Sequence, residues 1–154
     1  MSGIDVRRGT FEDRAFVAEL GARRLRSSVA SFRFVTDPML EFSYERLLEV
    51  VYAQSHVLLI ATADAVPAGF LLMLDQLPDE VTQMPQAFIA FMAAEPAFGG
   101  RGVGTRLLAA AEDEARKLGL PYMGLMVTEE NAAARTIYER AGFLTERRLL
   151  CKPL

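Results

Sequence analysis

Apolar residues along the chain first follow a helical spacing and then a strand spacing. In the N-terminal third, two segments repeat apolar residues every three or four positions, which is typical of a helix with one buried face. The first follows Thr10, a residue type that caps helices, and the second runs from about Glu41 to Gln54. A short strand from Ile4 to Arg8 precedes both, and a loop is predicted between them.

Strands dominate the middle of the chain. The most apolar window is nearly long enough to span a membrane, but Asp64, Pro67 and Gly69 interrupt it. We therefore expect a hairpin of two buried strands, Val57 to Ala63 and Ala68 to Asp75. Other strands are predicted at residues 86–94 and 122–127, and a last extended segment at residues 143–154.

Two further helices are predicted in the C-terminal half. They run from about Val103 to Leu118 and from Asn131 to Ala141, and Gly119 and Gly142 are placed to end them. No internal repeat or linker separates these elements. The pattern predicts a single domain over residues 1–154 of the α+β (α/β) class, with six or so strands and four helices.

The charge and the rare residue types exclude several function classes. A net charge of −3 gives no general attraction for nucleic acid or an anionic membrane, so neither is expected as a partner. One histidine, His56, and one cysteine, Cys151, are too few for a His/Cys metal site or an internal disulfide. A lone cysteine suits a reducing compartment, and residues 1–14 lack the apolar stretch of a signal peptide, so a cytoplasmic location is expected.

A glycine-rich turn precedes the helix predicted at Val103. Glycines at positions 99, 100, 102 and 104 surround Arg101. Such glycines let backbone N–H groups converge on an anion at the positive end of the helix dipole. A tight turn between strand and helix explains them about equally well. The turn lacks the lysine of a P-loop and does not fit the Rossmann spacing, so neither nucleotide motif is indicated.

Two motifs together are more specific than the turn alone. Residues 101–108, Arg-Gly-Val-Gly-Thr-Arg-Leu-Leu, follow a strand that ends in Glu95-Pro96. Residues 131–143 fit the pattern N-x-x-A-x-x-x-Y-x-x-x-G-F. In this order, roughly 25 residues apart and with a strand between them, they resemble the GCN5-related N-acetyltransferase (GNAT) superfamily. The resemblance covers nearly the whole chain.

The resemblance implies a fold and an activity. The fold is a GNAT-like mixed, mostly antiparallel central sheet of six to seven strands flanked by four helices, splayed at the cofactor strand near Ala93 and Ala94. The activity is direct acetyl transfer from acetyl-CoA to a primary amine of a small molecule or peptide, by an N-acetyltransferase. The residues assigned to the cofactor are Met92, Ala93, Ala94, Gly99, Gly100, Arg101, Gly102, Val103, Gly104, Thr105, Asn131, Ala134 and Tyr138.

Some roles stay open between the resemblance and simpler explanations. The resemblance makes Tyr138 the acid that protonates the leaving thiolate, whereas spacing alone favours a core tyrosine. Asn131 is equally well explained as a helix cap. Arg101, Arg106 and Arg135 are candidates for the cofactor phosphates or ordinary surface arginines.

Two positions depart from the family's pattern. Gly99 stands where the family's loop usually has Gln or Arg, and Ala90 and Phe91 occupy the strand position where many relatives carry an acidic base. The other candidates for a base are Glu95, Asp75, Asp79, Glu80 and His56, each also explained as a solvated or structural residue. Because of these departures, a non-catalytic acyl-CoA-binding regulatory module stays as the alternative function. A mononucleotide-binding domain is a third hypothesis.

Two loops, residues 27–44 and 76–85, occupy the places that frame the acceptor in the family. Phe32, Phe34, Phe42 and Tyr44 give the first an aromatic character. This indicates an acceptor with an apolar body, a dimer contact or core packing. The last segment, residues 147–154, could pair with a partner's sheet or close its own, so a homodimer is compatible with the sequence.

Overall fold

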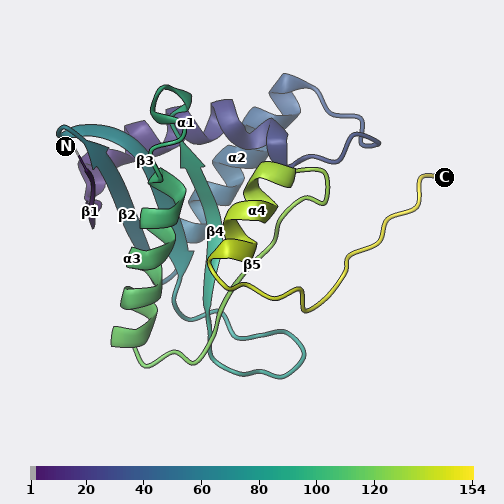
Figure 1. The fold of residues 1–154 in the computed structure, drawn as a ribbon. Helices are drawn as coiled ribbons and strands as arrows, with labels where there is room; N and C mark the ends of the chain where they lie inside the picture. The colour runs from purple at the N-terminus through teal and green to yellow at the C-terminus, as the bar shows by residue number, and fades with distance from the viewer. Residues whose placement is uncertain (1–2) are drawn as a thin grey trace.

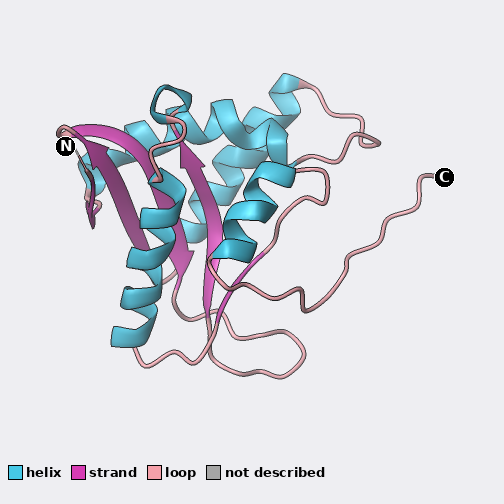
Figure 2. Ribbon diagram, in the orientation of Figure 1, coloured by secondary structure: helices cyan, strands magenta, loops and turns pink. Residues whose placement is uncertain are grey.

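The computed structural model describes residues 3–154 as one mixed sheet with helices on both faces (Figure 2). Five strands follow one another across the sheet in chain order: β1 (Ile4–Arg8), β2 (His56–Ala63), β3 (Val66–Leu74), β4 (Ala87–Ala94) and β5 (Met123–Leu125). The first four strands pair antiparallel, and β5 lies parallel to β4.

Three helices lie between the strands and a fourth follows β5: α1 (Arg14–Arg24), α2 (Asp37–Tyr52), α3 (Val103–Lys117) and α4 (Ala132–Arg140). The hydroxyl of Thr36 accepts a hydrogen bond from the N–H of Met39, so α2 begins earlier than the predicted Glu41. Thr10 caps a 3₁₀ turn, Phe11–Asp13, that leads into α1. No helix in residues 3–154 combines the length and apolar character needed to cross a bilayer.

Successive residues of β2 and β3 point to opposite faces of the sheet, which builds two cores. Figure 1 shows α3 and α4 on one face and α1 and α2 on the other. The side chains beneath α3 include Val57, Leu59, Ala61, Leu71 and Met73, and those against α1 and α2 include Leu58, Ile60, Phe70 and Leu72. Strands covered on both faces explain the near-continuous apolar sequence of the hairpin.

The predicted six to seven strands are wrong, because the sheet has five strands. Residues 143–154, predicted to be extended, form no strand and run away from the sheet towards the C-terminus (Figure 1). The side chain of Arg147 is held by Asp79, in the loop between β3 and β4, with nitrogen–oxygen distances of 2.8 and 3.0 Å. The segment is therefore drawn to that loop and does not pair with β5.

Candidate active site

The glycine-rich turn forms the start of α3. Gly100 and Gly102 have φ angles of 77° and 78°, in the left-handed region that favours glycine. A Cβ added at either residue would meet nothing within 4 Å, so the space above the backbone is open. Gly102 is the N-cap and supplies no capping side chain, which leaves the first N–H groups of α3 without an intrahelical acceptor. The turn therefore has the backbone geometry expected of an anion site.

The start of α3 lies very close to the sheet. A Cβ added at Gly69 in β3 would lie 2.7 Å from the Val103 side chain and 2.8 Å from the Ala93 carbonyl oxygen. Only a glycine allows this approach, which places the turn beside the end of β4. From the sequence, Gly69 was named only as an interruption of the apolar window and not as a site residue, although a glycine inside an apolar strand is a known signal of close backbone approach.

The second half of β4 has no partner on its β5 side among the described residues. Parallel pairing ends at Ile89 and Leu125. On the other side, Leu72 pairs with Phe91 and Met73 with Ile89, so Ala90 is bulged out of the register. The two strands thus separate directly after Ile89, earlier than the predicted Ala93 and Ala94. The backbone groups on this side of β4, from Ala90 to Ala94, have no strand to bind.

The helix α4 completes the site. The side chain of Asn131 caps it, with its Oδ1 accepting a hydrogen bond from the N–H of Ala134 at 3.2 Å. Tyr138 is partly buried against the α3 core and meets the ring of Phe143 edge to face at 5.9 Å. Its hydroxyl has no hydrogen-bond partner within residues 3–154. Burial raises the pKa of this phenol, so Tyr138 stays protonated at neutral pH.

The three predicted parts of the site meet at Gly104. A Cβ added there would lie 3.5 Å from Met92 of β4 and 3.7 Å from Ile137 of α4. The glycine turn, the unpaired half of β4 and the helix that carries Tyr138 are therefore neighbours, although they are distant in sequence. Ile137, which makes this contact, was not a sequence candidate because it is an ordinary apolar residue on the inner face of its helix.

Two of the three candidate arginines already have partners. Arg101 lies over the ring of Phe98 at 5.5 Å, and Arg135 pairs with Glu129 at 3.4 Å. Both pairs lie at the protein surface, where such contacts contribute little and can be exchanged.

Of the candidate bases, only Glu95 lies at the glycine-turn end of the sheet. Its carboxylate accepts two hydrogen bonds from Arg23 of α1, at 2.6 and 3.3 Å. These two hydrogen bonds occupy both oxygens of the carboxylate. Glu95 is thus a structural partner of α1 in this conformation and poorly placed to accept a proton.

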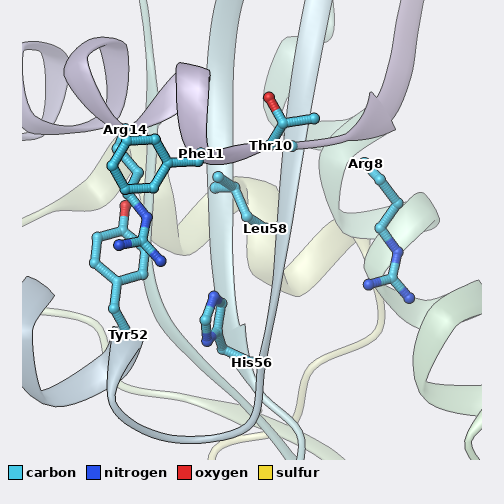
Figure 3. A pocket seen from close by; sticks show the side chains of 8 residues that line it. Arg8, Thr10, Phe11, Arg14, Tyr52, His56 and Leu58 are labelled. Carbon is cyan, nitrogen blue, oxygen red and sulfur yellow. The ribbon is translucent and has the colours of Figure 1, made fainter.

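His56 lies at the opposite end of the sheet. It pairs with Leu74, whereas Gly69, five residues earlier in β3, pairs with Ala94 beside the glycine turn. Five residues of strand separate the two ends by about 17 Å. In Figure 3 the ring of His56 lies beside Tyr52 in a pocket of about 160 Å³, which Phe11 and Arg14 also line. His56 is therefore not part of this site.

Asp75 and Asp79 belong to that same distant end, since both follow Leu74 and precede β4. Asp79 accepts hydrogen bonds from the N–H and hydroxyl of Thr82 and from Arg147, which together hold its pKa well below the usual range. Asp79 therefore holds its own loop and Arg147 in place. No group of three or more His, Cys, Asp or Glu residues able to hold a metal occurs within residues 3–154.

The first predicted acceptor loop is tied to the entrance of α4. Ser31 donates to Glu130 through its N–H at 2.9 Å, and Thr128 donates to the Ser28 carbonyl at 2.7 Å. Of the four aromatic residues predicted in this loop, Tyr44 alone fits the core-packing interpretation. Its hydroxyl is buried and donates to the Val17 carbonyl at 2.7 Å. The other three aromatic side chains are exposed: Phe32, Phe34 and Phe42.

Comparison with protein families gives one match that covers most of the chain. The model of the acetyltransferase (GNAT) family matches residues 22–143. The chain belongs to this family. The matched residues include the glycine turn, β4, β5 and α4, so the GNAT assignment and the geometry rest on the same part of the molecule. Among curated proteins, none is similar enough to the chain to count as a match.

Solved structures confirm the GNAT fold. A Pyrococcus furiosus protein assigned provisionally as an acetyl transferase has a TM-score of 0.83 at 23% identity, covering 98% of this chain and 99% of that one. The ribosomal-protein-alanine N-acetyltransferase of Brucella melitensis biovar Abortus has a TM-score of 0.71 at 18% identity, covering 99% of each chain. The aminoglycoside N-acetyltransferase AAC(6')-Iy, solved with CoA, has a TM-score of 0.71 at 20% identity, covering 100% of this chain and 96% of that one. Identities this low establish the fold alone.

Proposed function

We propose that this GNAT protein is an acetyl-CoA-dependent N-acetyltransferase, formed as a single domain over residues 1–154, that acetylates a primary amine of a small molecule or peptide in the cytoplasm. The observation that carries the proposal is the meeting at Gly104 of three features: a left-handed glycine turn at a helix N-terminus, an unpaired strand edge and a half-buried tyrosine. Each feature suits a different part of the same ligand.

The residues present fit acetyl-CoA. Open space above Gly100 and Gly102, next to free N–H groups of α3, suits a pyrophosphate. The unpaired side of β4 from Ala90 to Ala94 suits the amides of an extended pantetheine arm, which can take the place of a neighbouring strand. Acetyl-CoA supplies an activated acetyl group and a thiolate leaving group. AAC(6')-Iy, a protein of the same fold, was solved with CoA.

Tyr138 is proposed as the proton donor. Because its pKa is raised by burial, the phenol holds its proton throughout the neutral range and can pass it to, or share it with, a thiolate. The residues that hold the cofactor are proposed to be the thirteen named from the sequence. Asn131 contributes there mainly by fixing the first turn of α4, because its Oδ1 is used as the helix cap.

The acceptor is proposed to enter beside the loop that carries Phe32 and Phe34. Both rings are exposed, and the loop is fixed to the entrance of α4 by Ser31 and Thr128. An apolar, aromatic wall suits an amine attached to an apolar body. The comparison proteins act on an aminoglycoside and on a ribosomal protein by name, so both small and protein amines belong in the screen.

Ligand binding is tested first by thermal melting with acetyl-CoA, CoA, dephospho-CoA and ATP in parallel. A ligand that binds only the folded protein raises the melting midpoint by mass action. We expect a rise with the CoA forms and none with ATP. A rise with ATP alone would favour the mononucleotide hypothesis, and no rise with any CoA form would contradict the cofactor site.

Turnover is tested by the release of free thiol from acetyl-CoA with a panel of amines. Tyr138→Phe removes only the hydroxyl, so it should keep CoA binding and the melting temperature while kcat falls by about 10²-fold or more. Tyr122→Phe, which removes an exposed phenol beside the start of β4, at the opposite end from the glycine turn, is the control. Equal loss in both variants, or no loss in Tyr138→Phe, would contradict the assigned role.

A second candidate function is an acyl-CoA-binding regulatory module without turnover. The observation in its favour is that Ala90 and Phe91 hold the middle of β4, where many relatives carry an acidic base, and that Glu95 is paired with Arg23. This candidate predicts full CoA binding with no thiol released for any amine. An enzyme of this geometry must instead take up the amine already neutral or use water as the base.

A further inference from the structure

A second pocket lies at the end of the sheet opposite the glycine turn. Its volume is about 160 Å³. An apolar cavity of roughly 150 Å³ accommodates one benzene ring, so this pocket has room for a small ring compound. The lining comes from the segment that joins β1 to α1, from the end of α2 and from the start of β2. Among the described residues it includes two arginines and one histidine and neither aspartate nor glutamate, so the pocket favours an anion.

Arg14 supplies the charge of this pocket that has no acidic partner. The other arginine, Arg8, is paired with Glu114 of α3. Within the described part of the chain, Arg14 makes no hydrogen bond or ion pair. Its guanidinium carbon lies 4.0 Å from the ring centre of Tyr52 and 5.0 Å from that of Phe11, between the two rings (Figure 3). Stacking holds a guanidinium by its faces, so the N–H groups at its edge stay available for a planar acceptor such as a carboxylate.

The hydroxyl of Tyr52 is a second unused donor. It is buried and has no hydrogen-bond partner among the described residues, which is an unfavourable state for a hydroxyl. Burial raises the pKa of this phenol, so the group remains a neutral O–H donor. Figure 3 shows the hydroxyl pointing towards Phe11. The Phe11 side chain is 78% exposed, so a small movement of its ring gives a ligand access to the hydroxyl.

The floor of the pocket is apolar and firmly held. The N–H of Gly9 donates to the Leu58 carbonyl at 2.8 Å, and a Cβ added at Gly9 would lie 2.5 Å from the Leu58 side chain. The chain beyond β1 therefore packs directly on Leu58, which is buried. An apolar floor and ring wall with a few polar groups at one side is the usual composition of a small-molecule site.

We propose that this pocket binds a small carboxylate with a flat, apolar ring, about the size of benzoate. Arg14 binds the carboxylate through two N–H groups, and Tyr52 donates its hydroxyl to the same carboxylate. The ring lies between Phe11 and Leu58. One guanidinium and one neutral donor match the single charge of a carboxylate. The pocket lies about 17 Å along the sheet from the glycine turn, so its occupant leaves that turn open, and the proposal does not depend on the acetyltransferase activity.

Binding is measured by titrating benzoate and following nitrogen–hydrogen correlation NMR spectra of the labelled protein, which give affinity and location together. We expect saturable shifts with a Kd of about 1 mM, large at Thr10, Arg14 and His56 and small at Gly100 and Gly102. Benzyl alcohol has the ring without the charge, and acetate has the charge without the ring. Each should bind at least about tenfold more weakly than benzoate. Absence of saturable shifts, shifts centred on the glycine turn, or equal binding of benzyl alcohol or acetate would overturn the proposal.

Two substitutions test the two donors. Arg14→Gln removes the charge and Tyr52→Phe removes the hydroxyl, and in each the Kd for benzoate should rise about tenfold. Because the Tyr52 hydroxyl has no partner in the unliganded fold, Tyr52→Phe should keep or slightly raise the melting midpoint, so its weaker binding is not a result of unfolding. Arg24→Gln, at an exposed arginine in the last turn of α1, is the matched control and should bind benzoate like the parent protein. Unchanged affinity in either pocket variant, or an equal loss in Arg24→Gln, overturns the assignment.

Discussion

The glycine turn allows a test in which the conformational strain of a substitution is separated from its effect on the ligand. Gly102 has φ 78° and ψ 26°, and a Cβ there would meet no atom within 4 Å. Gly102→Ala therefore introduces no clash, and its effect on stability is the left-handed strain alone, about 1–2 kcal/mol. For a chain of this length, that corresponds to a melting midpoint lower by roughly 2–8 °C.

Gly102→Ala should also weaken the binding of the cofactor, independently of its effect on stability. The new methyl group would stand in the open space beside the N–H groups of α3, where a phosphate must approach. We expect the Kd for CoA to rise about tenfold or more, which is about 1.4 kcal/mol. The measurement is calorimetric titration with CoA at a temperature where the variant is fully folded.

Gly119→Ala is the matched control for this experiment. Gly119 has φ 71° and equally open surroundings, but it lies at the other end of α3. It should lose a similar amount of stability and bind CoA like the parent protein. If both variants bind CoA equally well, or if both lose it equally, the glycine turn is not the phosphate site and its glycines serve the turn alone.

Two further predictions concern stability. The hydrogen bonds from Arg7 lower the pKa of Asp13 from 3.8 to about 2. Asp13 therefore stabilises the fold above pH 3.8, and this contribution, at most about 2 kcal/mol, is lost as the pH falls from 3.8 to about 2. In urea unfolding, the Asp13→Asn variant should not show this loss of stability at low pH. Tyr44→Phe should lower the free energy of unfolding by about 1 kcal/mol, because the buried hydrogen bond of its hydroxyl is lost. Gly21→Ala should lower it by about 1–3 kcal/mol, because the new Cβ would lie 1.7 Å from the Tyr44 hydroxyl. An unchanged denaturant midpoint in either variant would contradict its prediction.

The sequence predicted the elements of the fold well where local chemistry decides them. The hairpin strands, α3 and α4 begin and end within a few residues of their predicted bounds. Asp64 and Ala65 turn the hairpin at positive φ, and Gly119 and Gly142 end the two helices in the same way, so these turns depend little on the rest of the fold. The start of α2 was predicted late, since the pattern of apolar residues begins only after the cap at Thr36 and the first turn of the helix is exposed.

The sequence could not predict what depends on contacts between distant segments. The bulge at Ala90 follows from how β3 and β4 pair, which no local pattern encodes. Gly69 signals a close backbone approach, but not that α3 is the element that approaches. The same holds for residues 143–154, which were predicted to be extended but form no strand, because joining a sheet depends on contacts with distant segments. The aromatic loop was ambiguous for a related reason: Phe32 and Tyr44 look alike in sequence, and only one is buried.

The site also explains why the cofactor can be inferred from this chain more readily than the acceptor. The features that suit the phosphates and the pantetheine amides of CoA are made by backbone: the free N–H groups after Gly102 and the unpaired edge of β4 beyond Ile89. Backbone groups that lack partners need an extended, amide-bearing and anionic ligand, whatever side chains surround them. An acceptor amine, by contrast, is selected by side chains, and those near the site are alanines, an ion-paired Glu95 and exposed rings. If members of a family keep the same backbone site but differ in the side chains around it, they bind the same acetyl donor and different acceptor amines. A fold of this kind therefore determines the donor, and the side chains determine the acceptor.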